Sequence, residues 1–284
     1  MLAILFCCAS IAIGQDKLPD SVRAFAQRMA SEREKIVSYR VGIVVEIKIL
    51  ESPDFVKLKS EKSAEYYFEF SRLEGHTVYA SRPIHFVNGK KHPLDWNAMG
   101  QSESFKFAGS AKKLALSEKV VMDTRLFFDP LAVGLQFCEM FNGYFSYEDS
   151  LLEWSRCSPG FVKSDASGMV ALNCPNDGIK IVVDSKQGFW PISYEAFHVF
   201  DVESLRRKQE DKIDQMLTQQ LTKVNGIHVP KETNISCLVD GKVGKQVCKL
   251  TFDWKTLNEP IKTGKEAALA VAEVLGMKVV KIAD

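Results

Sequence analysis

Residues 225–258 read NGIHVPKETNISCLVDGKVGKQVCKLTFDWKTLN, and this stretch decides the fold that we expect. Apolar and polar residues alternate on both sides of the turn-forming residues 241–244, which is typical of two antiparallel strands joined as a hairpin. Pairing the strands about that turn places Cys237 opposite Cys248. In an oxidising compartment the two cysteines can form a disulfide bond, and the alternative is a pair of reduced thiols in the core.

The same pairing divides the hairpin into an apolar face and a polar face. The apolar face carries the two cysteines together with Ile235, Val239, Leu250, Phe252 and Trp254. An antiparallel sheet with one face on the core and one face toward water shows this alternation. We therefore expect the hairpin to belong to a half-buried antiparallel sheet.

Other segments extend this pattern. Residues 18–37 space their apolar side chains as a helix does, and residues 38–50 (SYRVGIVVEIKIL) alternate strictly as a strand does. Further strands are predicted in 64–72, 76–82, 83–92, 160–165, 168–174 and 179–200. Residues 202–224 fit a helix or a strand, and we favour a strand from about residue 213 because Asn225-Gly226 places a hairpin turn directly after it.

Three more helices are predicted after residue 128. Asp129-Pro130 is typical of a helix start and precedes the apolar residues 131–141, and a second helix follows in 146–156. Thr263 and Glu266 form a capping box for a helix that Gly276 ends. The fold class is therefore α+β.

Residues 1–14 have the profile of a signal peptide. They are apolar from Leu2 to Ile13, and the chain becomes polar at Gln15. An uncleaved anchor is the competing interpretation, but the apolar run is shorter than the ~20 residues that span a bilayer. We expect export to the periplasm or cell envelope, with 15–284 as a single domain.

Composition excludes several function classes. With 37 Lys and Arg against 36 Asp and Glu, the net charge is +1, so the chain lacks the excess positive charge that attracts nucleic acid. The remaining cysteines show no metal-ligand spacing, so we expect no metal and no cofactor. Cys157 and Cys174 can form a second disulfide bond across a predicted hairpin.

One set of short motifs suggests an enzyme. Ser110 and Lys113 match S-x-x-K, and Lys262-Thr263-Gly264 match K-T-G, as in serine penicillin-recognising enzymes. That mechanism needs the serine at the start of a buried helix and K-T-G on a strand. Here K-T-G precedes a predicted helix, so the enzyme is a remote alternative and we expect no catalysis.

The order of elements resembles the outer-membrane lipoprotein carrier (LolA/LolB-like) superfamily. The resemblance is carried by the signal peptide, the first helix, the strand SYRVGIVVEIKI, the strand YYFEF, VNGK, DPLAVGL, IVVDSKQGFWP and the closing NG-x-x-VP hairpin. It implies a strongly curved antiparallel sheet, a half β-barrel, with helices packed across its concave face.

The resemblance also implies an apolar groove that holds acyl chains. Its wall would comprise Val41, Ile43, Val45, Phe68, Phe70, Leu250, Phe252 and Trp254. We expect an exported, non-enzymatic binding protein for an acyl chain or other lipid or lipoprotein moiety. The alternative is an envelope module that binds a protein segment through the curved sheet, and core packing alone also explains the apolar face.

Overall fold

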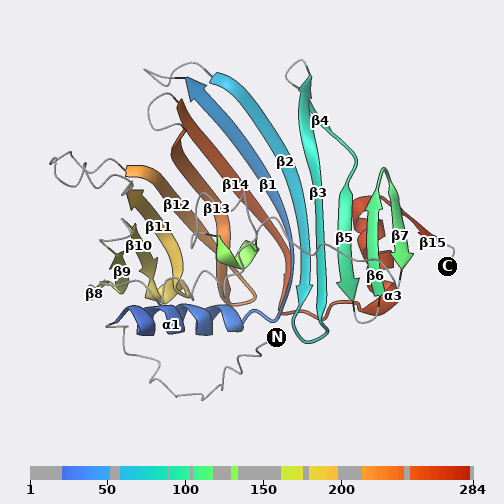
Figure 1. Cartoon of the computed structure of the whole chain (residues 1–284). Helices are drawn as coiled ribbons and strands as arrows, with labels where there is room; N and C mark the ends of the chain where they lie inside the picture. The colour runs from blue at the N-terminus through green and yellow to red at the C-terminus, as the bar shows by residue number, and fades with distance from the viewer. Residues whose placement is uncertain are drawn as a thin grey trace, which may run out of the picture.

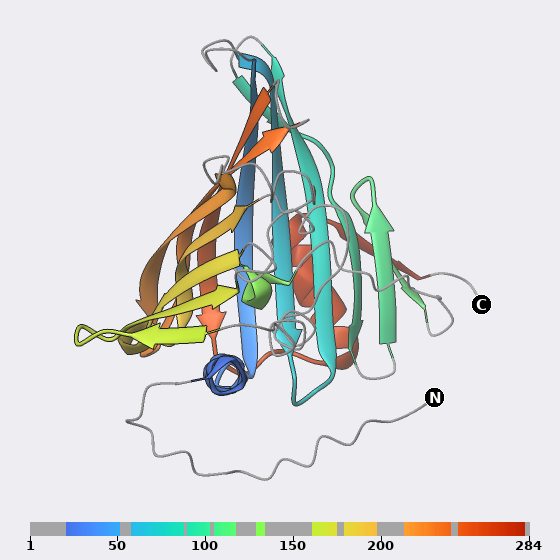
Figure 2. The ribbon, with the colours of Figure 1, turned by 60° about the vertical axis from the view of Figure 1, so that its left-hand side comes forward.

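The computed structural model describes residues 21–51, 58–87, 90–102, 105–117, 129–133, 161–174, 179–197, 213–239 and 244–281. These residues form one 15-stranded sheet that curves strongly and does not close (Figures 1 and 2). Neighbouring strands are antiparallel except β15 and β7, which are parallel. The expected curved antiparallel sheet is therefore present, and with its two described helices the protein is an α+β protein.

The strands are β1 Ser38–Glu51, β2 Leu58–Ser71, β3 His76–Val87, β4 Lys90–Pro93, β5 Asn97–Ser102, β6 Phe105–Ser110, β7 Lys113–Ser117, β8 Phe161–Ser164, β9 Met169–Cys174, β10 Ile179–Asp184, β11 Trp190–Phe197, β12 Ile213–Val224, β13 Ile227–Val239, β14 Gly244–Leu257 and β15 Lys278–Lys281. The helices are α1 Val22–Glu34 and α3 Gly264–Leu275, with 3-10 turns η1 Pro130–Ala132 and η4 Ser185–Gln187. The ambiguous segment before Asn225 is thus a strand from Ile213, as we favoured.

The sheet runs in the order β15-β7-β6-β5-β3-β2-β1-β14-β13-β12-β11-β10-β9-β8, with β4 paired to β3. The first strand of the chain lies at its centre, between β2 and the late strand β14 (Figure 1). Both partners are long, with 14 residues each. The quoted hairpin therefore joins the two halves of the sheet.

Helix α1 runs along one end of the strands (Figure 1). The hydroxyl of Ser21 caps it by accepting a hydrogen bond from the Ala24 N–H at 3.2 Å. Near its other end the buried Arg33 donates to the carbonyls of Gly188 and Phe189 at 3.0 and 3.3 Å and lies 3.4 Å from the centre of the Trp190 ring. These contacts fix α1 to the start of β11.

The helices expected across the concave face are not found among the described residues. Asp129 caps the turn at Pro130 as predicted, but the turn is 3-10 and the backbone at Val133 is no longer helical, with φ −58° and ψ 124°. Its buried apolar side chains join the core on the concave side (Figure 2). The rest of that prediction, 134–141, and the second predicted helix, 146–156, lie outside the described residues.

Helix α3 packs on the convex face of the sheet, opposite η1 (Figure 2). Its buried face joins a second core cluster with Tyr67, Val78 and Phe107. The predicted capping box does not form, because Thr263 makes no side-chain cap hydrogen bond. Instead, the N–H of Gly264 donates to the hydroxyl of Ser102 at 2.7 Å.

The register of the β13–β14 hairpin corrects the predicted cysteine pairing. Cys248 lies opposite Ile235, and Cys237 lies opposite Gln246, which is a shift of two residues from the predicted pairing. Because side chains alternate with a period of two, a two-residue shift preserves the face and removes the opposition. Cys248 is a buried thiol, so the predicted Cys237–Cys248 disulfide bond is wrong.

Cys174, at the end of β9, does form a disulfide bond. Its partner is not among the cysteines whose side chains the structure describes. Cys157, the predicted partner, lies outside the described residues, so that pairing stays a prediction.

Candidate functional site: a cavity on the concave face

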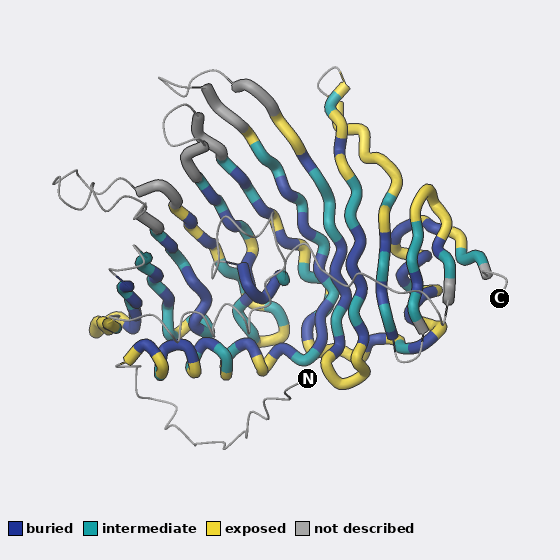
Figure 3. Tube along the Cα trace, in the orientation of Figure 1, coloured by how far each residue is buried: buried dark blue, intermediate teal, exposed yellow. Residues whose placement is uncertain are grey.

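The concave face of β1, β2 and β3 is built from rows of residues that lie opposite one another. One row is Val41, Phe68 and Tyr79, and another, further along the strands, is Val45, Ala64 and Pro83. The first row is buried, with at most 2% of each side chain exposed. In the second row Val45 is buried, Ala64 is half-buried and Pro83 is exposed. The face is therefore filled near α1 and opens toward the other end of the strands (Figure 3).

Side-chain size explains where the face opens. On the concave side of β2, successive residues are Phe70, Phe68, Tyr66 and then Ala64. The aromatic rings contact one another, with centroids 6.4 Å apart for Tyr66 and Phe68 and 5.4 Å apart for Phe68 and Tyr79. At Ala64 the side chain shrinks to a methyl group, so β2 supplies no further ring at Ala64 or Lys62.

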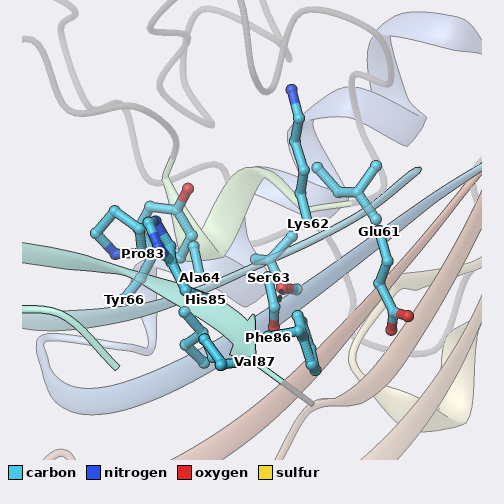
Figure 4. A pocket seen from close by; sticks show the side chains of 12 residues that line it. Glu61, Lys62, Ser63, Ala64, Tyr66, Pro83, His85, Phe86 and Val87 are labelled. Atoms are coloured by element: carbon cyan, nitrogen blue, oxygen red, sulfur yellow. Dashed lines mark hydrogen bonds between the residues drawn. The ribbon is translucent and has the colours of Figure 1, made fainter. Parts of the chain in front are cut away.

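A cavity of about 600 Å³ occupies this space (Figure 4). Apolar side chains of β1 and β3 supply much of its lining. Lys62 and His85 are the basic residues of the lining on the concave side. The full lining is Val45, Ile47, Glu61, Lys62, Ser63, Ala64, Tyr66, Pro83, Ile84, His85, Phe86 and Val87. We call this space the concave cavity.

The structure places the predicted groove residues on one face, as expected, but only Val45 lines the cavity. Across β1 and β14, Val41 lies opposite Trp254, Ile43 opposite Phe252 and Val45 opposite Leu250. Six of the predicted groove residues are buried in the main core cluster, namely Val41, Ile43, Val45, Phe68, Leu250 and Phe252. Phe70 and Trp254 are partly buried against it. The predicted wall therefore forms the floor of the concave face, and the cavity begins where that wall ends.

The charges around the cavity are divided between the two faces of the sheet. Glu61 and Lys62 are neighbours in β2, and they extend in opposite directions (Figure 4). Glu61 pairs with Lys48, with 3.7 Å between the Nζ and carboxylate oxygen atoms. Lys62 lies opposite Ile47 on the concave side. The lining thus contains one lysine and one glutamate, and the glutamate is paired with a cation on the convex side.

The convex face of the same strands carries a buried ionic network. Glu69 accepts hydrogen bonds from Arg40 Nε at 2.9 Å, His76 Nε2 at 3.1 Å and the Tyr67 hydroxyl at 2.6 Å. Burial alone would raise the pKa of the Glu69 carboxyl, but the hydrogen bonds from His76, Arg40 and Tyr67 outweigh it and hold the pKa below its usual value. Burial, followed by the charge of Glu69, raises the pKa of the Tyr67 phenol.

This network stabilises the fold and is not built for acid–base chemistry on a substrate. Glu69 and His76 are at most 1% exposed, and the carboxylate oxygens are occupied by donors from three side chains. A general base must reach the proton that it removes. Among the residues that the structure describes, no group of three His, Cys, Asp or Glu side chains could hold a metal ion.

The serine-enzyme motifs occupy the wrong elements for that mechanism. Ser110 ends β6 and lies opposite Lys113, the first residue of β7, across a tight turn in which Ala111 and Lys112 have positive φ. Thr263 and Gly264 begin α3. The S-x-x-K motif is therefore a strand turn, and K-T-G is a helix start.

Sequence reasoning missed the residues that make the cavity. Ala64 and Pro83 were visible as small residues beside the aromatic run YYFEF, and alternation assigns Lys62 to the same face as Ala64. That signal could have indicated a gap in the apolar face. It could not indicate that Pro83 lies beside Ala64, because this pairing depends on the β2–β3 register.

Comparisons with known proteins gave structural neighbours only. No protein-family model matches the chain, and no curated protein matches it. A DUF1329 family protein from Desulfovibrio piger superposes with a TM-score of 0.39 at 10% identity, covering 84% of this chain and 95% of that one.

Two further neighbours have similar scores. One is a domain from Vibrio parahaemolyticus, provisionally named for outer membrane lipoprotein sorting, with a TM-score of 0.39 at 9% identity, covering 90% of this chain and 99% of the other. The other is a LolA superfamily protein from Nitrosomonas europaea, to which this chain is similar with a TM-score of 0.37 at 12% identity. The match covers 83% of this chain and 94% of that one.

Proposed function

We propose that this protein is an exported, non-enzymatic binding protein that holds an acyl chain, or another elongated lipid moiety, in the concave cavity. The observation that carries the proposal is the cavity itself, about 600 Å³ in volume, at the open end of an otherwise filled apolar face. Ligand sites in proteins occupy about 300–1,000 Å³ and are mostly apolar, with a few polar groups. The concave cavity has that size and that lining.

The chemistry of the lining favours a hydrocarbon chain over a polar ligand. Val45, Ile47 and Val87 come from the two outer strands of the cavity, and Tyr66 lies between them on β2. Burial raises the pKa of the Tyr66 phenol, so this side chain is neutral. Each methylene group that leaves water for such a surface contributes about 0.8 kcal/mol to binding.

The cellular location and the partner complete the proposal. Residues 1–14 would direct export, and the protein would act in the periplasm or cell envelope on a lipid or a lipoprotein acyl chain. The resemblance of the sequence to lipoprotein carriers supports an acyl group as the occupant. None of the described helices is long and apolar enough to cross a membrane.

The test combines native mass spectrometry of protein from an expression host with titration of a fluorescent fatty acid. We expect a lipid-sized mass adduct and saturable uptake of the fluorescent probe by the wild-type protein. Ala64→Phe should remove both, because the ring would occupy the space next to Tyr66. If neither adduct nor uptake is seen, the proposal is wrong. Cross-linking of one defined envelope protein to an empty cavity would instead favour the alternative module.

A further inference from the structure

We infer that the ligand of the concave cavity is a single-chain amphiphile with an anionic headgroup, which Lys62 holds at the mouth of the cavity. The inference rests on the proposed function and adds the chemistry of the headgroup. It is carried by the unequal distribution of charge between the two faces of β1, β2 and β3.

Charges on the convex face of these strands are paired. Glu46 binds Lys91 with 2.9 Å between Nζ and the carboxylate oxygen, Glu61 binds Lys48, and Glu65 binds Arg82. The pairing lowers the pKa of Glu46, chiefly through the hydrogen bond from Lys91. Each of these three carboxylates thus has its own cation on the convex side, and none of the three is left to balance a charge on the concave side.

Lys62 is the exception to this balance. Its neighbours on the concave side are Ile47, directly opposite on β1, and Ala64, two residues further along β2. Within the described part of the chain, no carboxylate forms an ion pair with Lys62. His85, an exposed cavity residue on β3, adds a ring N–H donor and no negative charge.

This arrangement suits an amphiphile better than a neutral oil. A lysine covers apolar surface with its methylene stem and keeps its ammonium group in water. The ammonium group of Lys62 can therefore stay at the mouth while an acyl tail lies on Val45, Ile47 and Tyr66. An anionic headgroup would make a charge-assisted hydrogen bond there, whereas a cationic headgroup would be repelled.

The experiment compares ligands that differ only in the headgroup. Dodecanoate, 1-dodecanol and dodecylamine are each titrated against the full chain by displacement of the neutral reporter 1-N-phenylnaphthylamine. We expect wild-type protein to bind dodecanoate most tightly and dodecylamine most weakly. Lys62→Gln should weaken dodecanoate by about 3–5-fold, the size of an exposed ion pair, and leave 1-dodecanol within about twofold. Lys62→Arg should restore the preference.

Lys91→Gln is the matched control, because Lys91 pairs with Glu46 on the convex face of the same strands and neither residue lines the cavity. It should change none of the three affinities. The inference is overturned if Lys62→Gln weakens the acid and the alcohol equally, or if the wild-type protein binds the two equally; the proposed function survives either result. If none of the three displaces the reporter, the proposed function itself fails.

Discussion

The two faces of the sheet at β1, β2 and β3 differ in the side chains that cover them. On the convex face, Glu69 is buried with Arg40, His76 and Tyr67, and α3 covers the strands beside it. On the concave face, aliphatic side chains and aromatic rings fill the end near α1, and the other end is open. The same strands supply both faces, since alternate residues point to opposite sides.

The difference shows where the molecule can vary. A buried carboxylate with several charged or polar partners has a fixed geometry, and removal of one member leaves the others without compensation. An open apolar end has no such constraint, because water or a ligand can fill it. We therefore expect the convex face to determine stability and the open end of the concave face to determine binding.

The largest loss of stability is expected from Glu69→Ala. The substitution leaves the Arg40 guanidinium half-buried and His76 fully buried, both without their carboxylate, and should lower the free energy of unfolding by about 3–5 kcal/mol. Urea denaturation followed by circular dichroism measures it. Glu65→Ala is the control on the same strand and face: its pair with Arg82 is 28% exposed on both sides and should contribute no more than about 1 kcal/mol. Equal losses for the two variants would contradict the special role of the buried network.

A smaller loss is expected from Arg33→Leu, which tests the buried arginine that joins α1 to the start of β11. Arg33 lies at the closed end, where it donates to the carbonyls of Gly188 and Phe189 and stacks on Trp190. Two lost hydrogen bonds and a lost cation–π contact should cost about 2–3 kcal/mol in the free energy of unfolding. Arg28→Leu should cost less than about 1 kcal/mol, because the Arg28 side chain is 26% exposed and pairs with Glu32 on its own helix.

Much of this two-faced sheet was predictable from residue alternation. The strand of residues 38–50 and the hairpin of 225–258 place Val41, Ile43, Leu250 and Phe252 on one face, as the structure does. Alternation could not identify the register. Shifting the hairpin by two residues leaves its pattern unchanged, which is why the cysteines were predicted to pair and do not.

Other strands showed no alternation of apolar and polar residues from which we could predict them. Strands β5, β6 and β7 are short and rich in Gly, Ala and Ser, and we predicted no strands there. Gly100 is needed in β5 because the ring of Phe107 lies where a side chain would be, with 2.4 Å between a built Cβ and the ring. A glycine at this position weakens the sequence pattern of a strand, and the contact with Phe107 that requires it is visible only in the structure. The helix signal at Asp129-Pro130 was correct for the cap, but the turn that it caps is 3-10 and ends at Ala132.

The buried network also predicts how acid acts on the fold. Because hydrogen bonds hold the pKa of Glu69 below its usual value, the folded state binds fewer protons than the unfolded state as pH falls. This contribution to stability is complete above the unfolded pKa of about 4.3 and is lost as pH falls through the lower, folded pKa. The free energy of unfolding, measured by urea titration between pH 7 and pH 2.5, should decline in that window. The decline should be shallower for Glu69→Gln, and equal slopes would show that other carboxyls cause it.

The smallest effect on stability is expected at the open end, and one pair of identical substitutions isolates the difference between the faces. Ala64 on β2 is half-buried and lines the concave cavity, whereas Ala80 on β3 is fully buried on the convex face, where α3 shares its core cluster. Ala80→Phe must displace packed side chains and should cost about 1–3 kcal/mol or more. Ala64→Phe enters existing space and should change the free energy of unfolding by less than about 1 kcal/mol while removing uptake of a fluorescent fatty acid. If Ala64→Phe destabilises as much as Ala80→Phe, the cavity is not open space in solution, and the contrast between the two faces fails at the point where binding depends on it.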